Sequence, residues 1–115
     1  SNAWKAARWL NKHGYPTARY AEGFAVMPDF GIPFEHGWVE VDGRAYEITL
    51  AKDCQAYFTA ATYWAEGPTP ISLPLTEWPG MKYSRAHYRA MRECYTYVGV
   101  DGTVLDKMFA RWPER

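Results

Sequence analysis

The sequence has few of the features that identify a function at sight. It has only two cysteines in 115 residues, Cys54 and Cys94, and their spacing fits neither a disulfide-rich scaffold nor a zinc motif. Lysine plus arginine and aspartate plus glutamate both number 13, so the chain lacks the basic excess of a nucleic-acid-binding protein. No apolar run approaches the roughly 18 residues of a membrane span. We expect free thiols, a cytoplasmic location, and neither a nucleic-acid nor a membrane partner.

Motifs for a metal, a nucleotide or a flavin are also missing, so we expect no cofactor. The length suits one domain. Ser1-Asn2-Ala3 looks like the remnant of a cleaved tag, and Trp4 follows without an initiator methionine. We therefore expect residues 4–115 to form a single α+β domain that begins inside a longer natural chain.

The hydrophobic pattern predicts an antiparallel sheet with helices before and after it. The expected helices are 4–13, 84–95 and 103–112, and the expected strands are 19–27, 35–41, 44–50 and 55–64. Ser84 and Thr103 are the expected caps of the later helices. The alanines of 55–64 would also suit a helix, Asp101-Gly102 could instead turn a second hairpin, and the proline-rich segment 66–80 is expected to be mostly loop.

The most informative segment is the hairpin at 35–50, whose strands are joined by Asp42-Gly43. A two-residue turn pairs Val41 with Arg44 and puts His36 and Glu47 on the same face, about 7 Å apart diagonally. A three-residue loop would shift the register and separate them. A histidine beside a carboxylate is the base-and-orienter part of a nucleophilic triad, although such a pair can also be purely structural.

The stretch His36-Gly37-Trp38-Val39-Glu40-Val41, followed by Glu47-Ile48-Thr49, resembles the His-x-Trp-Val-Glu and Asp-Pro-Thr segments of transglutaminase-like cysteine hydrolases, which are related in core to papain. A looser similarity covers residues 20–25. The resemblance implies amide hydrolysis or acyl transfer, with His36 as general base and Glu47 as its orienting partner. In that family the nucleophilic cysteine begins the helix ahead of the first strand.

The expected helix at 4–13 contains no cysteine, so either the nucleophile lies just upstream of this sequence or the domain has lost catalysis, and we expect the chain to be inactive as it stands. Of the two thiols, Cys54 is the better candidate nucleophile, because Cys94 lies in the apolar stripe of its helix. Trp38 could wall a substrate cleft or belong to the core. Glu22, among apolar neighbours, is expected to meet a polar partner, for which Arg19, Arg85 and Arg89 are candidates.

Two other functions remain open. The chain could be a non-catalytic module that contacts a protein or peptide through segment 66–80, with an apolar patch at Trp78 and Pro79. The aromatic content of 17% could also serve a carbohydrate-binding surface, although large side chains equally help a small core. His13 and His87 are expected to be solvated helix residues.

Overall fold

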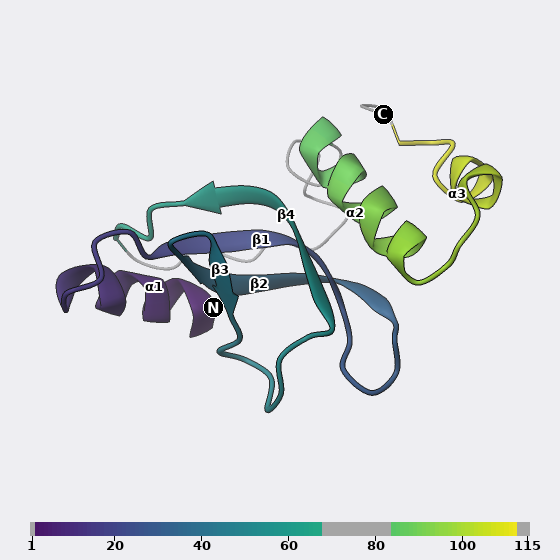
Figure 1. The fold of residues 1–115 in the computed structure, drawn as a ribbon. Helices are drawn as coiled ribbons and strands as arrows, with labels where there is room; N and C mark the ends of the chain where they lie inside the picture. The colour runs from purple at the N-terminus through teal and green to yellow at the C-terminus, as the bar shows by residue number, and fades with distance from the viewer. Residues whose placement is uncertain (1, 68–83, 113–115) are drawn as a thin grey trace.

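A computed structural model describes residues 2–67 and 84–112. In chain order the elements are α1 (Asn2–Lys12), β1 (Arg19–Val26), β2 (Pro33–Val41), β3 (Arg44–Tyr46), β4 (Ala56–Tyr63), α2 (Arg85–Tyr97) and α3 (Gly102–Met108) (Figure 1). The four strands form one antiparallel sheet in the order β3-β2-β1-β4. The α+β fold that the sequence pattern predicts is therefore confirmed.

The tight hairpin turn forms as predicted. Asp42 and Gly43 have φ angles of 51° and 77°, the left-handed pair that a two-residue type I′ turn requires. Val41 pairs with Arg44, and the next pairs follow in the expected register. The relative placement of the residues on β2 and β3 is thus set by the turn.

Strand β3 is shorter than expected, because it ends at Tyr46 rather than at residue 50. The Glu47 carboxylate accepts hydrogen bonds from the backbone N–H groups of Thr49 and Leu50, at 3.0 and 3.1 Å. These bonds close a local turn, and such side-chain-to-backbone bonds compete with strand pairing. The prediction of a strand over 44–50 is therefore wrong beyond Tyr46.

Strand β1 occupies the middle of the sheet, and Gly23 allows its neighbour to come close. The register between β1 and β4 shifts between Glu22 and Gly23. A Cβ atom at Gly23 would lie 2.1 Å from the carbonyl oxygen of Phe58, so only glycine fits. The strand interpretation of 55–64 is confirmed.

Helices α1 and α2 pack against the same face of the sheet. Ala3 and Ala7 of α1 pack with Val39, while Tyr97 of α2 meets Phe58 with ring centroids 5.8 Å apart. In Figure 1 the two helices lie at opposite ends of the sheet. The strand register places Val39 and Phe58 on one face, and His36 and Trp38 on the other. The helices therefore do not cover the face that carries His36.

The ends of the helices show further differences from expectation. Ser84 caps α2 by accepting the His87 N–H, as predicted. In α3 the cap is Asp101, whose carboxylate accepts the Thr103 N–H, and the helix ends at Met108. The Thr103 cap, the extension to 112 and the alternative hairpin at Asp101-Gly102 are therefore wrong.

Some expectations concern the start of the chain or fall partly outside the described ranges. Asn2 and Ala3 belong to α1, and Ala3 is buried in the core, so at least these two residues are part of the folded structure. Residues 68–80 of the predicted loop, with Trp78 and Pro79, lie outside the described residues. Within 2–67 and 84–112, none of the helices has the length and apolar character to cross a membrane.

Candidate functional site

The structure brings His36 and Glu47 into direct contact. His36 lies in β2, and Glu47 is the first residue after β3. The imidazole Nε2 lies 2.8 Å from Glu47 Oε1 and 3.0 Å from Oε2. Their side chains are only 10% and 2% exposed. The diagonal contact predicted from the hairpin is confirmed, although it forms where the chain has already left the sheet.

Glu47 is the centre of a wider hydrogen-bond cluster. Besides the imidazole, its carboxylate accepts the Tyr57 hydroxyl at 2.9 Å and the N–H groups of Thr49 and Leu50. Burial disfavours the ionised form of Glu47, but the combined hydrogen bonds outweigh it and lower the pKa of the carboxyl group. Glu47 is therefore an ionised carboxylate with nearly every acceptor position in use.

Cys54 joins the same cluster from the segment just before β4. Its Sγ lies 3.6 Å from Glu47 Oε1, and its backbone N–H donates to the Tyr57 hydroxyl at 3.0 Å. Burial raises the pKa of the Cys54 thiol to about 11, and the negative charge of Glu47 adds to the effect. The thiol is therefore protonated near neutral pH, and in this arrangement its polar partner is Glu47.

The three predicted catalytic residues are thus brought together, and the residue in the middle is Glu47: His36 and Cys54 each contact its carboxylate. One polar atom from each of His36, Glu47 and Cys54 lies within 4.8 Å of the other two. No hydrogen bond joins the thiol to His36 among the described residues. Because Nε2 carries the proton that it donates to Glu47, Nδ1 has the lone pair and is the nitrogen free to accept a proton.

Trp38 and Glu22 lie on opposite faces of the sheet. Trp38 is completely buried, and its ring packs against Tyr57 with centroids 4.9 Å apart, so it belongs to the core. Glu22 lies on the opposite face of the sheet from His36. It accepts the hydroxyls of Tyr20 and Tyr63, at 3.2 and 3.3 Å. The expected polar partner exists, but it is none of the three arginines suggested by the sequence.

Sequence reasoning missed two residues of these clusters. Tyr57 was part of an alternating strand pattern, and its place opposite Ala25 puts it on the face of His36. His87 is not solvated but 5% exposed, and its Nε2 lies 3.4 Å from Glu22 Oε1. Its spacing of three and four residues from Ala90 and Met91, on the buried stripe of α2, could have indicated this.

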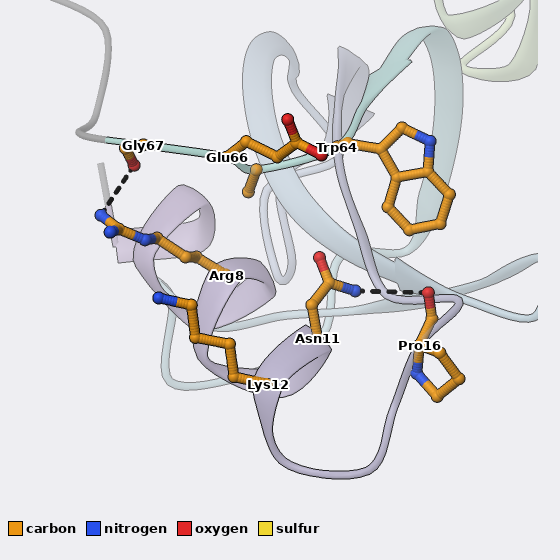
Figure 2. A pocket seen from close by; sticks show the side chains of 8 residues that line it. Arg8, Asn11, Lys12, Pro16, Trp64, Glu66 and Gly67 are labelled. Atoms are coloured by element: carbon orange, nitrogen blue, oxygen red, sulfur yellow. Dashed lines mark hydrogen bonds between the residues drawn. The ribbon is translucent and has the colours of Figure 1, made fainter.

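A separate hollow of about 330 Å³ lies between α1 and the segment that follows β4 (Figure 2). The Arg8 guanidinium donates to the Gly67 carbonyl at 2.8 Å across it, and Lys12 also lines it. The Trp64 ring forms part of the wall, and the guanidinium carbon of Arg19 lies 4.4 Å from the centroid of that ring. None of the predicted site residues lines this hollow, so it is distinct from the cluster around Glu47.

Comparison of the chain with protein-family models, with curated proteins and with solved structures finds no significant match.

Proposed function

We propose that the chain is a transglutaminase-like acyl-transfer or amide-hydrolysis domain in which His36 is the general base and Glu47 orients it. The observation that supports this proposal is the contact of 2.8 Å between Nε2 and the carboxylate. It fixes one tautomer of the imidazole and leaves Nδ1 as the proton acceptor. The resemblance of the hairpin to the transglutaminase-like motif assigns the same two roles.

The chemistry follows from that tautomer. His36 takes the proton of a thiol through Nδ1, and the thiolate attacks the acyl carbon of an amide. The tetrahedral intermediate then expels the amine, which receives the proton from the imidazolium. Water or a second amine releases the acyl group from the thioester. Throughout, the ionised Glu47 stabilises the positive charge on His36.

Cys54 is the thiol that we assign as nucleophile, in place of the cysteine that α1 lacks, so this proposal departs from the expectation of an inactive chain. It lies beside the pair, whereas Cys94 is completely buried in α2 and burial raises its thiol pKa to about 11. Attack requires the Cys54 side chain to turn from the Glu47 carboxylate towards Nδ1 of His36. The resting thiol is protonated, so the proposal requires general-base catalysis and not a preformed thiolate.

The alternative function is a non-catalytic binding module. One observation favours it: Glu47 sits between the thiol and the imidazole and accepts a hydrogen bond from each. A carboxylate used in this way also holds the segment between β3 and β4 against the sheet, which is a structural role. The two functions predict different results when His36 is replaced: the acyl-transfer domain loses turnover, whereas a binding module shows no turnover that depends on His36.

Hydrolysis of an activated ester, p-nitrophenyl acetate, separates them. His36→Asn and Cys54→Ser should each lower turnover by about 10²- to 10⁴-fold. The matched controls are His13→Asn, at an exposed histidine in the turn after α1, and Cys94→Ala, and both should retain the wild-type rate. Equal turnover in wild type and His36→Asn would reject the acyl-transfer proposal in favour of the binding module.

A further inference from the structure

We propose that His36, Glu47 and Cys54 together bind a divalent metal ion of the zinc type. They come from β2, from the residue after β3 and from the segment before β4, which the sheet brings together. An imidazole nitrogen, a carboxylate oxygen and a thiol sulfur lie within 4.8 Å of one another. This inference is independent of the acyl-transfer proposal, because it concerns what these side chains bind without a substrate.

The distances are close to those of a tetrahedral site. Zinc bonds of about 2.0–2.1 Å to nitrogen and oxygen, and of about 2.3 Å to sulfur, place neighbouring ligand atoms roughly 3.3–3.6 Å apart. Glu47 Oε1 and Cys54 Sγ are already 3.6 Å apart. His36 Nε2 is 2.8 Å from the same oxygen, so the imidazole must withdraw by about half an ångström. The imidazole nitrogen and Cys54 Sγ lie within 4.8 Å of each other and must approach to about 3.6 Å, so both of these side chains move when the ion binds.

The donor set selects the class of metal. A thiolate with an imidazole favours Zn²⁺ or Co²⁺ over Mg²⁺ and Ca²⁺, which prefer oxygen ligands. On binding, Cys54 gives its proton to solvent, while His36 stays neutral by moving its proton from Nε2 to Nδ1. The thiolate and the Glu47 carboxylate then balance the charge of the ion. A neutral cluster suits a site whose His36 and Glu47 side chains are 90% or more buried.

The surroundings already hold the carboxylate in place. The N–H groups of Thr49 and Leu50 bind Oε2, and the Tyr57 hydroxyl binds Oε1. Such outer contacts orient a ligand before the metal arrives and add to its affinity. Three protein ligands leave a fourth position for water, which is the composition of an open zinc site.

Metal binding and base catalysis would exclude each other at this site. The ion needs Nε2 of His36, the same nitrogen whose N–H bond to Glu47 defines the catalytic tautomer. The metal-loaded form therefore loses the base-and-orienter pair. If the acyl-transfer proposal also holds, Zn²⁺ is an inhibitor of that activity.

The test is a titration of the metal-free protein with Co²⁺ alone, followed by absorbance. We expect one equivalent to give the intense visible bands of four-coordinate Co²⁺ and a sulfur-to-cobalt charge-transfer band, and Zn²⁺ to remove both. Cys54→Ser should abolish the charge-transfer band and lower the affinity at least about 100-fold. His36→Gln should weaken binding but retain the band. Cys94→Ala is the matched control and should bind as wild type, with circular dichroism confirming that each variant is folded.

Two results would overturn the inference: a spectrum that stays that of hydrated Co²⁺, or a charge-transfer band that persists in Cys54→Ser. Because binding is read without substrate, the two proposals fail separately. Bound Co²⁺ with no esterase activity rejects acyl transfer and retains the metal site. Esterase activity that depends on His36, with no Co²⁺ signal, rejects the metal site and retains acyl transfer.

Discussion

Replacing Glu47 by alanine should destabilise the fold by about 3–5 kcal/mol. This carboxylate accepts hydrogen bonds from the buried His36 imidazole and the partly buried Tyr57 hydroxyl, and each bond to a charged group contributes about 1.5–3 kcal/mol. The N–H groups of Thr49 and Leu50 lie nearer the surface, where water replaces the lost acceptor. Removing one member of a buried, hydrogen-bonded pair costs a similar amount in other proteins.

Urea unfolding followed by tryptophan fluorescence, in metal-free buffer, measures this change. With an m-value of about 1.5 kcal/mol/M, the midpoint should fall by about 2–3 M. The matched control is Asp29→Asn, which removes the charge of an exposed ion pair with Lys52 whose N···O distance is 3.1 Å and suits the left-handed φ of 70° at that position. The two side chains of that pair are 62% and 67% exposed, so the control should cost less than about 1 kcal/mol.

The urea midpoints of the Glu47 variants and of the Asp29 control together show whether the Glu47 carboxylate stabilises the fold. Glu47→Gln retains one carbonyl oxygen and the shape of the side chain, so its midpoint should lie between those of wild type and Glu47→Ala. If Glu47→Ala lowers the midpoint no more than Asp29→Asn does, the carboxylate does not hold the segment between β3 and β4, and the reasoning from its hydrogen bonds is refuted.

Three further predictions follow from the same structure. In metal-free buffer, the free energy of unfolding should fall as pH drops below about 4.5, because the pKa of Glu47 in the folded state lies below its ordinary value. The contribution of Glu47 to stability is full above the unfolded-state pKa and is lost as pH falls through the folded-state pKa. Glu47→Gln should flatten this pH dependence in urea unfolding. Gly23→Ala should lower the melting temperature by at least about 10 °C in a circular-dichroism melt, since its Cβ would meet the Phe58 carbonyl; an unchanged melt would contradict the close approach. Iodoacetamide at pH 8 should label Cys54 and Cys94 much more slowly than in the unfolded chain, because burial raises both thiol pKa values to about 11; equal rates would contradict that burial.

The hairpin could be predicted because residues close together in the sequence determine both its turn and the pairing of its strands. Asp42-Gly43 is a pair of residues that readily adopts the two left-handed conformations a tight turn requires. Once the turn is fixed, the two-residue period of the strands sets which side chains share a face. Those two rules bring His36 near Glu47, and the local turn after Tyr46 completes the contact.

The rest of the site depends on a segment without periodicity. After Tyr46 the chain turns back through bonds between Glu47 and the backbone, and only this path brings Cys54 beside the carboxylate. No alternation or helical spacing encodes such a path. For this reason the sequence could name Cys54 as a candidate but could not give its partner, and it gave no role to Tyr57.

The two carboxylate–imidazole pairs of the sheet show why His36 is the residue to test for chemistry. His87 is held at both nitrogens: Nε2 faces Glu22, and Nδ1 meets the Ser84 hydroxyl, which also caps α2. Both ring nitrogens of His87 therefore already have a polar partner within the fold. His36 has a carboxylate at Nε2 and no hydrogen-bond partner at Nδ1 among the described residues. His36 Nδ1 is thus free and lies near a thiol, whereas the contact of His87 with Glu22 joins α2 to the sheet, so His36 is the histidine whose replacement tests the acyl-transfer proposal.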